Sequence, residues 1–243
     1  MEQVINDFYT SLNEKDSALY LKTVVDSASK QPLSTQLEDT KIDFSILQSK
    51  KINDYKYEVY VSKTVDGVEY PVTPYDVVLE NGQWKFDNSS VIIYPKKVLN
   101  ELFNNINEAG YKITDKFFTT FSQNIISENE NFIVKKFNNI ESEGISLFSE
   151  LNYNFNQKST DIYSPGTINV YSDPGANDED DDSYNFVVAE LYDEDPIDNY
   201  LWDTDFLDAF DNDSTSFNHS GYIGVKVYNF NYPWLTGKYT VTW

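Results

Sequence analysis

The chain has 243 residues, enough for one large domain or two ordinary ones. It carries 40 Asp and Glu against 18 Lys and no Arg, and this net charge of −22 argues against a nucleic-acid backbone or an anionic membrane as partner. It has no Cys, which excludes disulfides and thiolate metal sites, and no apolar run near the roughly 20 residues of a membrane span.

The negative charge is concentrated in the C-terminal part of the chain. Residues 1–158 hold 16 Lys against 23 acidic residues, whereas residues 159–243 hold 2 Lys against 17. Sixteen of the carboxylates lie between Asp173 and Asp213, where there is no Lys. So much uncompensated charge repels itself unless water, salt or a bound cation screens it. The change in charge predicts a domain boundary near residue 158.

Two short helices are predicted at the N-terminus. The first spans residues 2–13, where apolar residues recur on one helical face. This face consists of Val4, Ile5, Phe8, Tyr9 and Leu12. Asp16 or Ser17 provides the N-cap of the second helix, and Gln31-Pro32 is expected to end it. The apolar face of the second helix consists of Leu21, Val24, Val25 and Ala28.

The apolar period then changes from helical to alternating, which predicts strands. The alternating positions are Ile42, Phe44, Ile46, Tyr55, Tyr57, Val59, Val61, Val68, Tyr70, Val72, Tyr75, Val77, Leu79, Trp84 and Phe86. Asp66-Gly67 and Asn81-Gly82 are dipeptides typical of two-residue hairpin turns. The predicted fold of residues 1–94 is therefore α+β, with a helix pair covering one face of an antiparallel meander.

The order of helix, helix and meander resembles the nuclear-transport-factor-like superfamily of cone-shaped α+β domains, as found in bacterial lipoproteins. The resemblance covers residues 1–94, where the meander ends in the segment VVLENGQWKFD at residues 77–87, and it is most specific in the strand GQWKF at residues 82–86. It implies that Trp84 packs on the helices and that the sheet forms one wall of a pocket.

Enzymes of this superfamily usually place an Asp, or a His–Asp pair, in that pocket. Residues 1–94 contain no His, so Asp43, Glu58 and Asp76 remain as candidate lone bases. A small-ligand-binding or catalytic cone domain is therefore an alternative function for the chain.

Residues 95–157 are predicted to form a mainly helical connector. Pro95 in the first turn and Gly110 at the end bracket one amphipathic helix. Its apolar residues are Val98, Leu99, Leu102, Phe103 and Ile106. Residues 117–126 can continue helically, whereas residues 133–137 fit a strand as well as a helix.

From residue 158 to residue 243, short apolar segments separated by turn residues predict an acidic antiparallel β-sandwich. The expected strands are residues 166–171, 184–191, 222–230 and 238–243. The segments GTIN, DSYNF and the closing GYIGVKVYNFNYPWLTGKYTVTW resemble bacterial pre-peptidase C-terminal domains, which include the collagen-binding domains of clostridial collagenases. Residues 201–210 depart from that pattern and fit a short helix as well as a strand.

The acidic turn at residues 178–182 is a candidate Ca²⁺ site. Its Asp178, Asp180, Asp181 and Asp182 can supply several of the about six to eight oxygens that Ca²⁺ requires. The alternative is a solvated acidic loop that keeps the protein soluble. A second candidate set consists of Asp203, Asp205, Asp208, Asp211 and Asp213.

No residue is assigned a catalytic role. His219 is the sole histidine, no Gly-x-Ser-x-Gly accompanies it, and it is expected in a surface turn. Tyr228, Tyr232 and Trp234 are expected to be exposed and to supply a binding patch for a protein or a glycan.

These features favour a non-enzymatic, secreted or cell-surface bacterial protein whose Ca²⁺-stabilised sandwich binds a protein or a glycan. Met1 is the only Met, which fits a mature exported domain whose leader is replaced by a start codon; a cytosolic protein is the alternative. A third hypothesis is an acidic, immunity-type protein that neutralises a basic partner.

Overall fold

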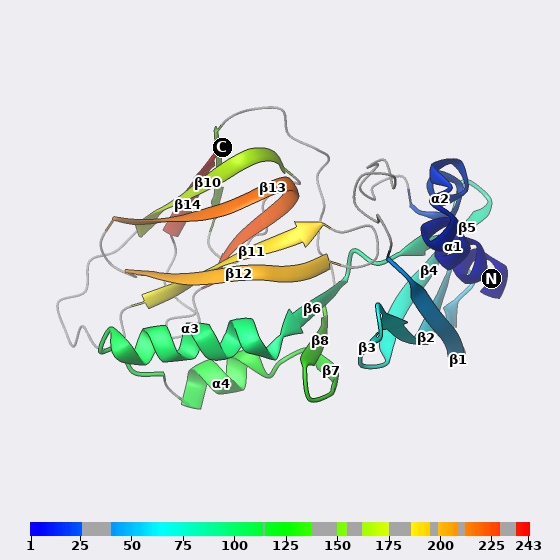
Figure 1. Ribbon diagram of the computed structural model, residues 1–243, viewed down its shortest axis with the longest axis horizontal. Coiled ribbons are helices and arrows are strands. Elements are labelled where there is room, and N and C mark those ends of the chain that lie inside the picture. Colours follow the sequence, from blue (N-terminus) through cyan, green and yellow to red (C-terminus); the bar gives the residue numbers. More distant parts are fainter. Residues whose placement is uncertain are drawn as a thin grey trace. The chain divides into compact units, whose positions relative to one another are not determined.

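The protein folds as α+β and divides into two compact units (Figure 1). The computed structural model describes residues 1–25, 40–113, 115–137, 150–154, 162–174, 186–194, 199–208, 212–228 and 237–243. The first unit comprises Met1–Tyr94, Asn124–Ile140 and Asp195–Asn199, and the second comprises Pro95–Gln123, Glu141–Glu194 and Tyr200–Trp243. The chain leaves the first unit after residue 94, and residues 95–157 are shared between the two units.

The predicted helix pair is present. Helix α1 (Glu2–Glu14) buries the five apolar residues expected of it, and helix α2 (Ser17–Thr23) is capped by the Asp16 carboxylate. That carboxylate accepts hydrogen bonds from two backbone N–H groups of the first helical turn, each at 3.0 Å. Helix α2 ends earlier than expected, because Val24 turns to an extended conformation and forms a parallel bridge with Phe86.

An antiparallel sheet follows in the first unit. Its strands are β1 (Ile42–Asn53), β2 (Lys56–Val65), β3 (Val68–Glu69), β4 (Thr73–Glu80) and β5 (Gln83–Asp87), in the order β1-β2-β4-β5 with β3 paired to β2. Both predicted turns are confirmed: Asp66 and Gly67 have φ of 50° and 82°, and Asn81 and Gly82 have φ of 50° and 79°. Positive φ at both central residues is the geometry that Asp-Gly and Asn-Gly favour in a two-residue hairpin.

The core between α1 and this sheet is aromatic. Phe86 of β5 stacks on Phe8 with 4.0 Å between ring centroids, and Tyr9 stacks on Phe44 of β1 at 4.3 Å. The resemblance implied this role for Trp84, but Trp84 makes an edge contact with Tyr57 at 5.1 Å. The aromatic residue of β5 that stacks on α1 is thus two residues further from the turn.

A second group of strands completes the first unit. It consists of β7 (Ile125–Glu128), β8 (Phe132–Lys136) and β6 (Val91–Pro95), in the order β7-β8-β6. Hairpin β7–β8 reaches the first sheet through its side chains: the Ser127 hydroxyl donates to the Val72 carbonyl at 2.6 Å, and Phe132 stacks on Tyr70 at 4.5 Å. The hairpin is therefore fixed to the meander of its own unit.

The prediction of a mainly helical connector is wrong at β7, whose Ile125 and Ile126 are expected to continue a helix, whereas β8 takes the strand alternative left open for residues 133–137. Helix α3 (Lys96–Glu108) forms as predicted and α4 (Asp115–Phe121) follows, but Asn124 then takes a left-handed φ of 67°. In the hairpin turn, the Asn129 side chain accepts hydrogen bonds from the N–H groups of Asn131 and Phe132, both at 2.9 Å. This local turn, with β-branched residues after it, favours a strand over a helix.

The second unit contains helices α3 and α4 and a set of long strands. The strands are β9 (Glu150–Asn154), β10 (Ile162–Pro174), β11 (Phe186–Glu194), β12 (Asn199–Asp208), β13 (Asp213–Tyr228) and β14 (Gly237–Thr242), in the order β12-β11-β13-β10-β14-β9. Strand β13 pairs antiparallel with β10 over residues 213–223 and with β11 over residues 223–228. One strand thus joins both halves of the sheet.

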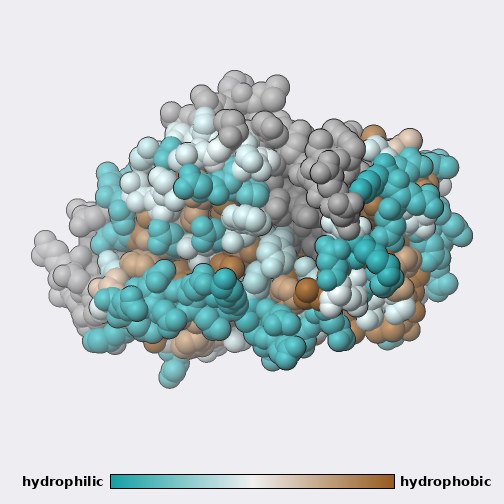
Figure 2. Space-filling view, viewed as in Figure 1, coloured by the Kyte–Doolittle hydropathy of each residue, from teal (hydrophilic) through white to brown (hydrophobic). Residues whose placement is uncertain are grey.

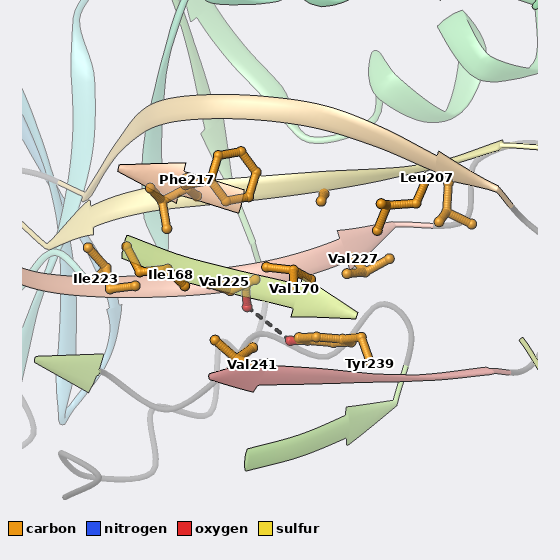
Figure 3. Close-up of a cluster of buried hydrophobic side chains, with 12 residues drawn as sticks. Ile168, Val170, Leu207, Phe217, Ile223, Val225, Val227, Tyr239 and Val241 are labelled. Carbon is orange, nitrogen blue, oxygen red and sulfur yellow. Dashed lines mark hydrogen bonds between the residues drawn. The ribbon is translucent and has the colours of Figure 1, made fainter. Parts of the chain in front are cut away.

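The core of the second unit lies among these strands (Figure 3). Its buried members are Ile168, Val170, Val187, Ala189, Leu191, Leu207, Phe217, Ile223, Val225, Val227, Tyr239 and Val241. The Tyr239 hydroxyl donates a hydrogen bond to the Val225 carbonyl at 2.9 Å, so its polar end is satisfied inside the core. On the other face of β11, Phe186 contacts Tyr111 at 5.5 Å and Phe206 at 6.4 Å.

Two further expectations for the second unit are settled. Of residues 201–210, which fit a helix as well as a strand, the described residues 201–208 belong to strand β12, with Leu201 and Leu207 buried. The expectation that His219 lies in a surface turn is wrong, because it lies within strand β13 and its ring contacts Trp202 at 4.6 Å.

No helix of the described residues is both long enough and apolar enough to cross a membrane.

Candidate functional site

The main predicted metal and ligand residues fall largely outside the described part of the chain. Asp178, Asp180, Asp181 and Asp182 lie outside it, as do Tyr232 and Trp234. Within the described ranges, no three or more His, Asp or Glu side chains are grouped so that they can hold a metal ion. The Ca²⁺ hypothesis for residues 178–182 therefore stays a prediction.

The second acidic set serves local hydrogen bonding in its described members. Asp205 accepts from the Phe206 N–H at 2.9 Å and from the Thr215 hydroxyl, and Asp213 accepts from the Asp208 N–H at 2.9 Å. The pKa of Asp203 is raised, chiefly by burial and then by the neighbouring charges of Asp205 and Glu101. Asp211 lies outside the described residues.

Tyr228 is half-buried in a polar cluster between β11 and β13. Its hydroxyl lies 3.3 Å from that of Tyr192, which donates to the buried carboxylate of Glu190. The Lys226 ammonium stands 4.0 Å from the centre of the Tyr228 ring, a cation–π arrangement. Tyr228 therefore takes part in internal contacts of the second unit.

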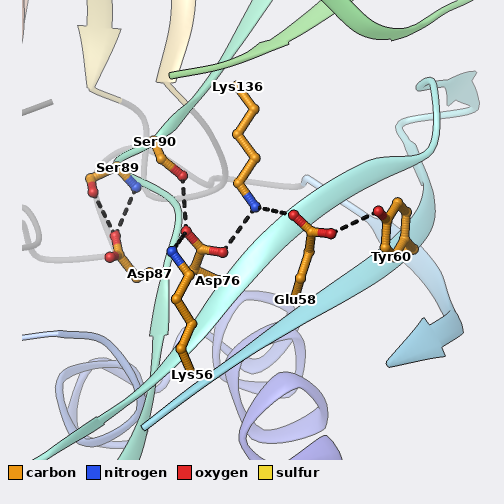
Figure 4. A network of polar contacts seen from close by, with 8 residues as sticks. All are labelled: Lys56, Glu58, Tyr60, Asp76, Asp87, Ser89, Ser90 and Lys136. Carbon is orange, nitrogen blue, oxygen red and sulfur yellow. Dashed lines mark hydrogen bonds and ion pairs between the residues drawn. The ribbon is translucent and has the colours of Figure 1, made fainter. Parts of the chain in front are cut away.

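The candidate bases of the first unit form an ion-pair network, here called the lysine–carboxylate cluster: Lys56, Glu58, Tyr60, Asp76 and Lys136 (Figure 4). Asp76 is buried, and its carboxylate lies 2.7 Å from the Lys56 ammonium and 2.9 Å from that of Lys136. Lys136 also bonds Glu58 at 2.7 Å, and the Tyr60 hydroxyl donates to Glu58 at 2.7 Å. Lys136 belongs to β8, so the cluster joins that hairpin to strands β2 and β4.

The environment of Glu58 makes it a poor general base. Burial acts to raise the pKa of its carboxyl group, but the hydrogen bonds from Lys136 and Tyr60 outweigh burial and lower that pKa. The bond to Glu58 in turn raises the pKa of the Tyr60 hydroxyl. Asp43, the third candidate, is well exposed and lies 3.1 Å from the Lys41 ammonium. These carboxylates therefore act as ion-pair partners.

A different surface, on the second unit, combines properties of a binding site. Alternating residues of β13, β10 and β14 point away from the core and form what we call the neutral face. Its members are Ser214, Ser216, Asn218, Thr167, Asn169, Tyr171, Thr240 and Thr242. Figure 2 shows pale, weakly polar atoms interspersed with hydrophilic ones over β10 and β13. Tyr171 is 46% exposed on β10, which lies between β13 and β14.

The strand register places the members of the neutral face in rows. Tyr171 lies between Ser214 of β13 and Thr240 of β14, and Asn169 lies between Ser216 and Thr242. The Ser216 hydroxyl donates to the Asn169 side-chain oxygen at 2.8 Å, and the Asn169 amide donates to the Thr242 hydroxyl at 3.4 Å. A hydrogen-bonded line of neutral side chains thus crosses all three strands.

The neutral face was missed in the sequence, although a signal for it exists. In residues 214–220, Ser and Asn alternate with Thr215, Phe217 and His219, and residues 167–171 and 238–242 show the same period of two. The pattern predicts one polar and one apolar side for each segment. That the polar sides of these segments are neighbours follows only from the strand order.

The chain matches no protein-family model, and a search of curated proteins gives no match either.

Proposed function

We propose that this chain is a non-enzymatic, secreted or cell-surface protein that binds a protein or a glycan through the neutral face. The single observation that carries the proposal is Tyr171, an exposed aromatic ring set among small uncharged donors and acceptors in a protein of net charge −22. Exposed tyrosines surrounded by polar side chains are common anchors of binding sites because they offer an apolar ring and a polar tip.

The lysine–carboxylate cluster supports the non-enzymatic part of the proposal. A lone base in the first unit would need a carboxylate within hydrogen-bond reach of the substrate proton that it removes. Asp76 is the buried candidate, and it already has two lysine partners. The cluster therefore favours a structural role over the alternative of a catalytic cone domain.

The proposal is tested by screening the whole chain for binding on an array of neutral polysaccharides and extracellular-matrix proteins. We expect the Tyr171→Ala variant to lose about tenfold in affinity for whichever ligand binds, since aromatic contacts contribute up to about 1.5 kcal/mol and about 1.4 kcal/mol corresponds to tenfold. Tyr55→Ala is the matched control, because Tyr55 is 69% exposed and lies in the first unit. Equal affinities of wild type and Tyr171→Ala would remove the neutral face as the binding site.

We further propose that Ca²⁺ stabilises the second unit through residues 178–182. Millimolar Ca²⁺ is expected to raise the melting temperature by roughly 2–4 °C for each kcal/mol that Ca²⁺ binding adds to the free energy of unfolding. EDTA is expected to reverse the rise. The control replaces CaCl₂ by NaCl of the same ionic strength, because simple screening also relieves the repulsion of acidic residues. A melt that responds equally to both salts would contradict Ca²⁺ binding.

A further inference from the structure

We infer that the ligand of the neutral face is an uncharged polysaccharide; the inference rests on the proposed function and names the ligand class for the same surface. Three features of the face lead to this class: the regular array of its hydrogen-bonding groups, the ring of Tyr171, and its charge.

The regular spacing of donors and acceptors on the neutral face suits a chain of hydroxylated sugar rings. Neighbouring strands are about 4.8 Å apart, and residues on the same side of one strand are roughly 7 Å apart. Donors and acceptors therefore recur across the face at a spacing close to the size of one sugar ring. The row Ser216–Asn169–Thr242 is held by its own hydrogen bonds, and the Thr167 hydroxyl donates to Asn218 at 3.1 Å in the next row. These bonds fix the side chains before a ligand arrives, which reduces the entropy cost of binding.

The ring of Tyr171 supplies the apolar part of the contact. A sugar ring has faces of C–H groups and a rim of hydroxyls, so it packs on an aromatic ring while its hydroxyls reach polar neighbours. Tyr171 lies between Ser214 and Thr240 in one row. Asn169, two residues before it on β10, lies in the neighbouring row. A ring stacked on Tyr171 thus has hydroxyl groups of the protein on both sides.

The charge of the chain selects against other ligands. Nucleic acids and anionic polysaccharides are repelled by a net charge of −22. The eight members of the neutral face carry no charge, and the flanking pair Asp173 and Lys238 stands opposite in register at one end. Protein interfaces are instead enriched in large aromatic residues and Arg, whereas seven of the eight members of this face are Ser, Thr or Asn. An uncharged polysaccharide meets no electrostatic penalty at this face.

The test is a depletion assay with the full chain and suspended microcrystalline cellulose, chitin, curdlan and granular starch. Polygalacturonate gel forms the anionic arm, and collagen- and fibronectin-coated beads form the protein arm. Wild type is compared with Tyr171→Ala, Tyr171→Phe and the control Tyr55→Ala. Because Tyr171 is half exposed, each variant is first shown to keep the wild-type circular dichroism and melting temperature.

The expected result is binding to at least one neutral polysaccharide, weakened about tenfold by Tyr171→Ala and changed less than about threefold by Tyr171→Phe, which keeps the ring. Binding only to the protein or anionic arm, still lost in Tyr171→Ala, would overturn the inference and leave the proposed function standing. Binding that Tyr171→Ala does not weaken, or no binding in any arm, would overturn both.

Discussion

Replacing Lys136 by Met is expected to lower the free energy of unfolding by about 3 kcal/mol, since removal of one partner from a buried ion pair typically costs 3–5 kcal/mol. The Lys136 ammonium is the shared partner of Asp76 and Glu58, and its side chain is only 13% exposed. Without it, Glu58 loses this partner and Asp76 keeps the Lys56 ammonium at 2.7 Å, in a region that water reaches poorly. Urea unfolding followed by circular dichroism measures the change.

The control for this variant is Lys97→Met. Lys97 lies 3.8 Å from Glu101 on the surface of α3, with both side chains well exposed. Pairs of this kind contribute about 0.5 kcal/mol or less. If both variants unfold at the same urea concentration as wild type, the lysine–carboxylate cluster does not hold hairpin β7–β8 in place.

The same variant should also change the pH dependence of stability. The pKa of Glu58 is lower in the folded state than in the unfolded state. Its contribution to the free energy of unfolding is therefore fully present above the unfolded pKa of about 4.3, and it is lost as the pH falls through the folded pKa. Lys136→Met removes a cause of that lowered pKa. The acid side of its stability profile is therefore expected to be shallower than that of wild type, as is that of Glu58→Gln.

Local signals were sufficient to predict much of the first unit. The cap at Asp16 and the turns at Asp66-Gly67 and Asn81-Gly82 depend on neighbouring residues alone, and all three have the expected geometry. Periodicity predicts a helix at residues 125–126 of β7 and leaves residues 133–137 of β8 open, because apolar residues at short spacing fit both periods. The side chain of Asn129 sets the turn between the two strands. A single turn residue does not change the apolar period, so periodicity alone does not reveal it.

The candidate sites depended on contacts between distant residues. Lys136 meets Asp76 across sixty positions of the chain, and no spacing rule connects them. The neutral face likewise joins β10 to β13 and β14, and Asn169 bonds a residue 73 positions away. Alternation predicted which side of a strand is polar, but only the strand order shows that three polar sides form one surface. The acidic turn stands out in the sequence by its charge, whereas the members of the neutral face carry none.

Replacing Phe86 by Ala is expected to cost about 3–5 kcal/mol, the usual range for truncating a buried phenylalanine. Phe86 is 1% exposed, stacks on Phe8 at 4.0 Å and lies 5.0 Å from Tyr75, so the smaller side chain leaves a cavity among rings. The Phe86 carbonyl accepts from the Val25 N–H at 3.1 Å, and this backbone bond is kept in the variant. The loss therefore reports on side-chain packing between α1 and the sheet.

The matched control is Trp84→Ala, on the same face of β5 two residues away. Trp84 is only partly buried and contacts Tyr57 by its edge, so its truncation is expected to cost about half as much, on the order of 1–2 kcal/mol. Urea unfolding of both variants compares the two roles directly. If Trp84→Ala proves the more destabilising, the packing of the helix pair rests on Trp84, as the resemblance to cone-shaped domains implied, and the assignment of that role to Phe86 is wrong.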